Sequence, residues 1–284
     1  MQEIIRQECT RLGHQFINIQ RLHGGDVSQA FAVETSGGRF FIKMNDAAQC
    51  PGLFANEAEG LRALALATPL RVPGIIAVGE TEGYQYLVLE WLEKTRPAPD
   101  FWERMGHGLA SLHQNSAPQF GWAKANNIGP LVQPNHWAST WPEFYTSRRI
   151  MPLVEELFNR ASFTKKDIGN AEGLYKKLSI IFPTEPPALL HGDLWSGNYM
   201  SVGGLPAIFD PAVYFGHREM DIAMTLLFGG FDPQMYAAYH EVFPLEKDWR
   251  KRLPVAQLYP LLVHAVLFGG GYVGQCKNIL AEWR

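Results

Sequence analysis

The chain has 284 residues, of which 46% are hydrophobic and only 19% are charged. This composition excludes a disordered or low-complexity chain, and the length favours two packed cores over one. The net charge of −3 argues against a broad nucleic-acid-binding surface.

The cysteines and the apolar segments indicate the compartment. Cys9, Cys50 and Cys276 show neither metal-ligand spacing nor a disulfide framework. Residues 2–15 lack the apolar core of a signal peptide. The longest apolar stretch, Leu258–Gly274, is interrupted by proline, histidine and glycine, which favours buried helices over a membrane span. We therefore expect a cytoplasmic protein without a membrane segment.

The first 92 residues predict a small antiparallel sheet with one or two helices. Residues 2–15 place their apolar side chains on one helical stripe, and a second helix is predicted after Pro51. The predicted strands are Ile17–Leu22, Gln29–Glu34, Arg39–Met44, Ile75–Gly79 and Tyr84–Glu90.

A glycine-rich turn between the first two strands is a candidate phosphate-binding loop, because backbone without Cβ atoms can approach an anion closely. Its residues are Gly24, Gly25, Asp26, Val27 and Ser28. The turn matches neither G-x-G-x-x-G nor the Walker A pattern, so taken alone it favours an ordinary hairpin.

Lys43 lies on the third predicted strand between apolar neighbours, where a charged side chain needs a partner. Glu57 on the following helix is the expected partner, and Glu59 faces another side. In kinases such a pair holds the lysine against nucleotide phosphates. The alternative is a surface salt bridge, worth at most about 1 kcal/mol.

The sheet is predicted to end at Leu92, and the polar, proline-containing segment Lys94–Asp100 follows it. A hinge there would offer backbone groups near Glu90 and Leu92 to an adenine ring. We therefore expect a nucleotide-binding lobe over residues 1–92 and a helical lobe over residues 93–284.

The second lobe contains an unusual insertion between predicted helices at Phe101–Gln114 and Phe144–Arg160. It is rich in aromatic and amide side chains, among them Gln133, Asn135 and Trp137. Such side chains suit a sugar-like ligand, and long irregular segments are often functional. Tryptophans that fasten a loop to the core explain the same pattern equally well.

The strongest motif is His191-Gly192-Asp193-Leu194-Trp195-Ser196-Gly197-Asn198, followed by Asp210. An acid, an amide five residues later and a second acid are typical of kinase-like phosphotransferases. Asp193 would accept the proton of the attacking hydroxyl, and Asn198 and Asp210 would be ligands of Mg²⁺. The alternative, a loop whose acids only satisfy turn hydrogen bonds, does not explain the full spacing.

Four residues in or near this motif have supporting roles in the prediction. Gly203-Gly204 predicts a hairpin that returns the chain toward Asp210. Asp221 precedes an apolar helix, which it could cap while it orients the motif from behind. Trp195 could form an apolar wall beside the reacting hydroxyl. The role of Glu219 stays open.

These residues resemble the fructosamine kinase (ketosamine kinase) family, within the wider group of aminoglycoside- and choline-kinase-like enzymes. The wider group is indicated by the motif at residues 191–198, by Asp210 and by Asp221-Ile222-Ala223. The narrower family is indicated by Trp195, Gly24-Gly25-Asp26, Phe54 with Glu57, Asn127-Ile128-Gly129, Gln133, Asn135, Trp137, Trp141, Phe144-Tyr145 and Arg149.

The resemblance implies an α+β, bilobal protein-kinase-like fold with a small antiparallel-sheet lobe and a larger, mainly helical lobe. It implies ATP and Mg²⁺ as cofactors, with Asp193 as the base and Lys43 on the phosphates. The implied reaction phosphorylates the 3-hydroxyl of a ketosamine, free or attached to a glycated protein, after which the product breaks down and frees the amine.

Two rival functions stay open at this point. One is phosphorylation of another small alcohol, such as an aminoglycoside or choline, although an aminoglycoside would favour a more acidic pocket. The other is a non-catalytic nucleotide-binding module, against which the joint presence of Lys43, Asp193, Asn198 and Asp210 argues. The preferred sugar and the oligomeric state do not follow from the sequence.

Overall fold

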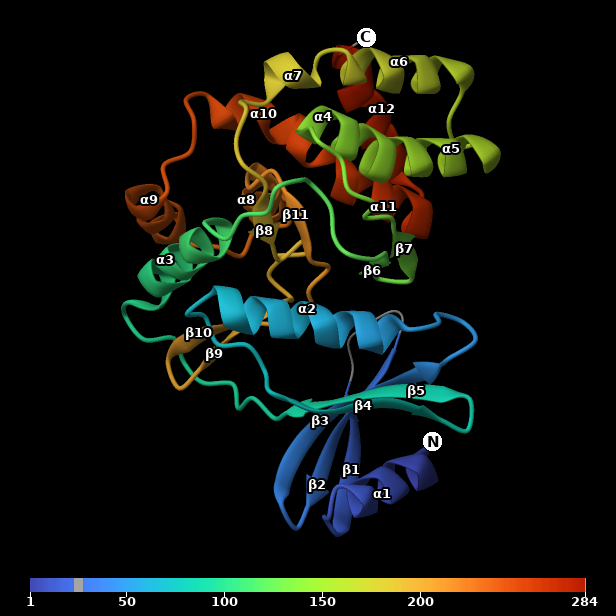
Figure 1. Cartoon of the computed structure of the whole chain (residues 1–284), viewed down its shortest axis with the longest axis vertical. Coiled ribbons are helices and arrows are strands. Elements are labelled where there is room, and N and C mark those ends of the chain that lie inside the picture. The colour runs from blue at the N-terminus through green and yellow to red at the C-terminus, as the bar shows by residue number, and fades with distance from the viewer. Residues whose placement is uncertain (23–27, 284) are drawn as a thin grey trace. The chain divides into compact units, whose positions relative to one another are not determined.

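The computed structural model describes residues 1–22 and 28–283, which form two compact units. Unit 1 comprises Met1–Phe101 and Tyr199–Asp210, and unit 2 comprises Trp102–Asn198 and Pro211–Arg284. Unit 1 contains an antiparallel sheet and unit 2 is mainly helical, so the predicted α+β fold is confirmed (Figure 1). The predicted lobe boundary after residue 92 stays a prediction. In the structure, residues 93–101 and 199–210 group with the sheet.

The sheet of unit 1 has five strands in the order β1-β2-β3-β5-β4, and each strand is antiparallel to its neighbours. All five predicted strands are confirmed, with small differences at their ends. The strands are β1 (Phe16–Leu22), β2 (Gln29–Thr35), β3 (Gly38–Asp46), β4 (Ile75–Thr81) and β5 (Tyr84–Glu90).

One helix covers each face of this sheet. Helix α1 (Gln2–Arg11) packs on the face that carries Ile42, Met44 and Val88. Helix α2 (Leu53–Ala67) packs on the opposite face, against Leu87 and Leu89, and lies along the sheet in Figure 1. Each fully buried Leu or Phe contributes about 1.5–3 kcal/mol to this packing.

The alternation of side chains along β3 decides where its lysine points. Because successive side chains of a strand point to opposite faces, Lys43 lies on the face opposite Ile42 and Met44. That is the face on which α2 lies. The strand period therefore directs the Lys43 ammonium toward α2, although the neighbouring residues are buried apolar side chains.

The predicted hairpin after the motif at residues 191–198 is confirmed. Strands β9 (Tyr199–Val202) and β10 (Leu205–Ile208) are antiparallel, and Gly203 and Gly204 adopt φ values of 59° and 85°. Two left-handed residues make the turn that matches the twist of a hairpin. The backbone of this hairpin bonds Arg71, Thr95 and Ala98, which explains its place in unit 1.

Unit 2 contains most of the helices of the chain. They are α3 (Phe101–His113, whose first residue is in unit 1), α4 (Trp141–Phe144), α5 (Met151–Asn159), α6 (Lys165–Tyr175), α7 (Leu178–Ile181), α8 (Glu219–Leu227), α9 (Pro233–Val242), α10 (Trp249–Ala256), α11 (Leu258–Phe268) and α12 (Gly271–Glu282). Within the described ranges, no helix is both long and apolar enough to cross a bilayer.

Unit 2 also contains two short strand pairs that the sequence did not predict. They are β6 (Asn126–Ile128) with β7 (Leu131–Gln133), and β8 (Ala188–Leu190) with β11 (Tyr214–Gly216). Strands of three residues carry too little periodicity to be recognised in a sequence.

The predicted helix Phe144–Arg160 is interrupted by a π-helical segment, η1 (Tyr145–Ile150). Pro152 follows it, and a proline has no N–H to donate to the carbonyl four residues earlier. That carbonyl belongs to Arg148, and it accepts a hydrogen bond from the Arg149 guanidinium instead, at 3.2 Å.

Two helical glycines give a matched test of packing in unit 2. A Cβ on Gly106 of α3 would lie 2.3 Å from the backbone oxygen of Met235 on α9, whereas a Cβ on Gly169 of α6 would meet no atom within 4 Å. We expect Gly106→Ala to destabilise the protein by about 1–3 kcal/mol through overpacking. Gly169→Ala should stabilise it by about 0.5–1 kcal/mol.

Thermal and urea unfolding of both variants beside the unchanged protein provide the measurement. Equal changes of the same sign would contradict the close approach of α3 and α9.

Candidate active site

The motif at residues 191–198 forms a loop that leaves β8 through a left-handed glycine. Gly192 has φ of 82°, and a Cβ on it would lie 2.0 Å from the backbone oxygen of Ala212. The N–H of Ala212 donates to the carbonyl of His191 at 2.9 Å. Only glycine permits both the backbone angle and this close approach.

Asp221, at the start of α8, holds the first residues of the loop. Its buried carboxylate accepts the backbone N–H groups of His191 at 2.7 Å and Gly192 at 2.9 Å. Burial alone would raise the pKa of Asp221, but the bonds and charges of His113, His191 and Gly192 lower it. The carboxylate is therefore ionised and fixes the loop backbone.

His113, to which the sequence assigned no chemistry, extends this network. Its Nε2 lies 3.2 Å from Asp221, and its Nδ1 lies 2.8 Å from the hydroxyl of Tyr239 on α9. All three side chains are buried. No local pattern could reveal this role, because the partners are more than a hundred residues away along the chain.

Asn198 orients Asp193 within the loop. Its side-chain amide donates to the backbone oxygen of Asp193 at 2.9 Å and to the Asp193 carboxylate at 3.1 Å. The amide nitrogen is thus used inside the loop, and Oδ1 is the atom through which an asparagine binds Mg²⁺. The structure brings the predicted base and one predicted metal ligand into direct contact.

Trp195 is the exposed aromatic side chain of the loop, with 40% of its surface accessible. Its ring lies over Gly197, where a Cβ would approach the indole to 2.3 Å. The ring also meets the edge of Phe228 at a centroid distance of 6.5 Å. Gly197 therefore provides the space in which the indole lies flat next to the loop.

In unit 1, Lys43 lies between two carboxylates. Its ammonium is 2.8 Å from Glu57 and 2.5 Å from Asp210. Burial would lower the pKa of Lys43, but the two carboxylates outweigh it and raise that pKa. Burial raises the pKa of Glu57, and Lys43 opposes this shift. The pair between β3 and α2 is therefore present, and Asp210 joins it.

Asp210 adopts a left-handed backbone conformation with φ of 58°. Such a conformation costs a non-glycine residue roughly 1–2 kcal/mol, and Asp tolerates it better than most. Strained residues of this kind concentrate at functional sites. The conformation places the Asp210 carboxylate against Lys43.

The donor chemistry of Asn198 and Asp210 fits Mg²⁺. Among the described residues, no three His, Cys, Asp or Glu side chains gather into a metal-binding group. Mg²⁺ is usually held by one or two protein oxygens together with phosphates and water, and does not require such a group. Two carboxylates that share one ammonium also leave negative charge for a cation to balance.

The remaining predicted nucleotide contacts are placed as follows. Gly24, Gly25, Asp26 and Val27 lie outside the described residues, and Ser28 is half-buried just before β2. Glu90 ends β5, where its carboxylate accepts from the Arg71 guanidinium and from the N–H of Gly74. Leu92 follows, half-buried. The side chain of Glu90 therefore fastens the segment before β4.

Two of the predicted substrate residues have structural partners within unit 2. Gln133 and Asn135 are almost fully buried. Gln133 donates to Asn126 and Ala212 and accepts from Tyr259, and Asn135 donates to Lys124 and Asn126 and accepts from Arg149. Their amides fasten the insertion, and the prediction that they bind substrate stays a prediction.

Arg149, on the π-helical segment, anchors the same insertion. Its fully buried guanidinium donates to the carbonyl of Pro134 and to the Asn135 side chain, at 2.5 Å and 2.6 Å. It also lies over the rings of Tyr214 and Phe144, at 4.1 Å and 4.6 Å. Trp137, the third predicted substrate residue of the insertion, remains 43% exposed and stacks on Phe215.

Comparison with known proteins identifies the family. Residues 1–283 match the family model described as fructosamine kinase. The chain belongs to the fructosamine kinase family. The predicted resemblance is confirmed, and the protein is a phosphotransferase that uses an alcohol group as acceptor.

Named relatives agree with this membership. A probable ketoamine kinase of Synechocystis is 39% identical and covers 99% of this chain and 96% of its own. One of Enterococcus faecium is 40% identical, with 92% and 93% covered. The structure of a probable fructosamine-3-kinase of Thermobifida fusca superposes with a TM-score of 0.88 at 35% identity, covering 98% and 97%.

More distant structures show the kinase-like fold. An aminoglycoside phosphotransferase superposes with a TM-score of 0.66 at 17% identity, with 100% of this chain and 99% of that chain covered. A structure of a mutant of that enzyme holds ADP and hygromycin B, with a TM-score of 0.63 at 17% identity and 97% of each chain covered. At this identity the likeness concerns the fold.

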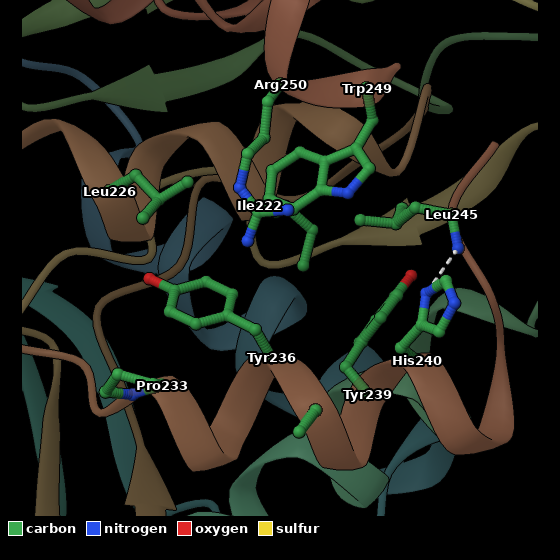
Figure 2. A pocket seen from close by; sticks show the side chains of 10 residues that line it. Ile222, Leu226, Pro233, Tyr236, Tyr239, His240, Leu245, Trp249 and Arg250 are labelled. Atoms are coloured by element: carbon green, nitrogen blue, oxygen red, sulfur yellow. Dashed lines mark hydrogen bonds between the residues drawn. The ribbon is translucent and has the colours of Figure 1, made fainter. Parts of the chain in front are cut away.

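This kinase also has a pocket of about 490 Å³ in unit 2 that the sequence did not predict. Figure 2 shows its lining from α8, α9 and α10, with Tyr236 and Tyr239 on one side and Trp249 and Arg250 on the other. Tyr239 also bonds His113. The pocket therefore shares one side chain with the network that holds Asp221.

Glu219, which the sequence left unassigned, has a structural partner. Its buried carboxylate accepts from the Arg252 guanidinium, from Nε at 2.8 Å and from Nη2 at 2.5 Å. This ion pair joins α8 to α10.

Asp221→Asn tests the role of the buried carboxylate in this kinase. An amide offers one acceptor oxygen where the two backbone N–H groups need two, so we expect a loss of roughly 1–3 kcal/mol of stability. The rate kcat should fall further than the loss of folded protein explains, because Asp193 loses its fixed backbone.

Asp232→Asn is the matched control, since Asp232 is an exposed cap of α9 and Asn caps equally well. Urea unfolding and steady-state kinetics of both variants are the measurements. An Asp221→Asn enzyme with unchanged kcat would contradict the positioning role.

Proposed function

We propose that this kinase transfers the γ-phosphoryl group of ATP to the 3-hydroxyl of ketosamines of the fructosamine, ribulosamine or erythrulosamine type. The observation that carries the proposal is the loop in which Asn198 orients Asp193 and an exposed Trp195 follows two residues later. Membership of the fructosamine kinase family and the names of the relatives support it. Breakdown of the 3-phosphate would free the amine, which makes the activity a deglycation.

In the proposed reaction Asp193 accepts the proton of the sugar hydroxyl as the oxygen attacks phosphorus. Positioned bases contribute about 10²–10⁴ to rates. Asn198 holds the carboxylate of Asp193 in place, and Asp221 holds the backbone behind it. Each of these groups limits the freedom of the base before substrate arrives, which is the usual route to a lower barrier in phosphoryl transfer.

Lys43 would bind the phosphates, positioned by Glu57. The ion pairs keep it protonated, which an interaction with phosphate requires. Nucleotide use is supported by the family and by the ADP in a structure of the same fold. Mg²⁺, held by Asn198 and Asp210, would neutralise phosphate charge when bound.

Trp195 would offer its exposed face to the carbon chain of the sugar, next to the reacting hydroxyl. Sugars commonly bind to aromatic faces through their apolar edges, while their hydroxyls find polar partners. Trp137 is a second exposed ring on unit 2, but it lies in a separate stack with Phe215 and Trp122. We therefore propose Trp195 as the principal aromatic contact.

A substrate panel tests the proposed function. We expect ATP-dependent phosphorylation of fructosamines, ribulosamines or erythrulosamines, with the phosphate on the 3-hydroxyl by phosphorus-coupled NMR. Aminoglycosides and choline should be poor substrates. Strong turnover of either one, with none of any ketosamine, would overturn the substrate assignment, and absence of all turnover would favour a non-catalytic module.

Two substitutions test the division of labour between the acids. Asp193→Asn should lower kcat by roughly 10²–10⁴ while calorimetry shows nearly unchanged Mg-ATP binding. Asp210→Ala should weaken Mg-ATP binding itself, since it removes a charged metal ligand. The reverse pattern, with nucleotide lost in Asp193→Asn and kept in Asp210→Ala, would exchange the two roles.

A further inference from the structure

Five aromatic side chains of unit 2 touch one another in a continuous series that begins at Trp195. Trp195 meets Phe228 at a centroid distance of 6.5 Å, and Phe228 meets His264 at 4.9 Å. His264 then contacts Phe268 at 5.5 Å and Tyr272 at 5.1 Å. We name these five residues the aromatic strip.

The strip is accessible along its length. Trp195 is 40% exposed, Phe228 37% and Phe268 55%, and the other two rings are half-buried. Single exposed apolar side chains are common on protein surfaces and need no explanation. A contiguous series of them, drawn from the 191–198 loop, the end of α8, α11 and α12, is typical of a binding surface.

Local geometry holds the strip in place. The Nδ1 of His264 lies 2.8 Å from the carbonyl of Pro260, and because a carbonyl only accepts, Nδ1 carries the proton. This bond fixes the central ring. The pair His264 and Phe268 is spaced four residues apart on α11, so both rings lie on one helical face.

The strip is also continuous with the loop that carries the proposed base. Trp195 follows Asp193 by two residues. On the other side, the backbone after Phe228 approaches the loop closely, since a Cβ on Gly230 would lie 2.5 Å from that of Ser196. A substrate whose hydroxyl reaches Asp193 therefore has the beginning of the strip beside it.

The chemistry of a ketosamine determines which part of the substrate reaches the strip. Only the carbonyl carbon and one methylene lie between the reacting carbon and the nitrogen. The substituent on nitrogen must therefore leave the site within a few bonds of Asp193. None of the strip residues is an acid, lysine or arginine, so the surface suits an apolar substituent better than a charged one.

We propose that the aromatic strip binds an apolar or aromatic substituent on the ketosamine nitrogen. This inference rests on the proposed function and adds to it the class of amine carrier that the kinase prefers. Trp195 contacts the sugar end, and Phe228, His264, Phe268 and Tyr272 contact the carrier. Burial of the carrier against these rings stabilises the complex through the hydrophobic effect.

The test compares two ketosamines with the same sugar, one made from methylamine and one from benzylamine. We expect kcat/KM for the benzyl compound to exceed that for the methyl compound by roughly tenfold, which corresponds to about 1.4 kcal/mol. Phe268→Ser and Phe228→Ser should each reduce this ratio severalfold. A ratio within one variant is insensitive to the amount of folded enzyme.

Ile180→Ser is the matched control, because Ile180 is 84% exposed on α7 and lies outside the strip. It should leave the ratio unchanged. Equal use of both ketosamines, or a preference that survives Phe268→Ser and Phe228→Ser together, would overturn the inference while the proposed function stands. Absence of turnover with either ketosamine would overturn the proposed function itself.

Discussion

The arrangement of the 191–198 loop depends on one buried carboxylate, that of Asp221. The loop starts with a left-handed glycine, and two of its backbone N–H groups point into the protein, where unpaired donors are costly. Asp221 accepts both, and the carboxylate is itself stabilised by His113, which bonds Tyr239. The Asp221 carboxylate thus links the end of β8 and helices α8, α3 and α9 in one hydrogen-bond network. The Asp221 carboxylate therefore fixes the backbone that leads to Asp193 and Asn198.

Unit 1 contains a buried ammonium group, that of Lys43, which needs charged partners. Lys43 is paired with two carboxylates from distant parts of the chain, Glu57 on α2 and Asp210 after β10. The first partner follows from the strand period, which turns the lysine toward α2. The second requires a residue in a strained backbone conformation. Glu57 and Asp210, two acids that were predicted to act in nucleotide or metal binding, therefore pair with the same Lys43 ammonium.

The features that were predicted correctly from the sequence are those that depend on residues close together in the chain. Strand-like segments bounded by turn signals predicted the sheet, and two adjacent glycines predicted the hairpin at Gly203 and Gly204, because these signals act over a few residues. The expected pairing of Lys43 with Glu57, 14 residues along the chain, was also found. Gln133 and Asn135 show where this reasoning ends. A sequence shows that an amide can form hydrogen bonds, but it does not show with which partners. Here the partners include Arg149 and Tyr259, which are distant in sequence. The catalytic roles of Asp193, Asn198 and Asp210 stay predictions.

The buried guanidinium of Arg149 fastens the aromatic insertion through two backbone carbonyls, an amide oxygen and three aromatic rings. None of these partners gains or loses a proton between mildly acidic and mildly alkaline conditions. An interior site is also poorly screened by dissolved ions. The fastening of this segment is therefore insensitive to acidity and ionic strength, whereas the Lys43–Glu57 pair depends on a carboxylate that can gain a proton.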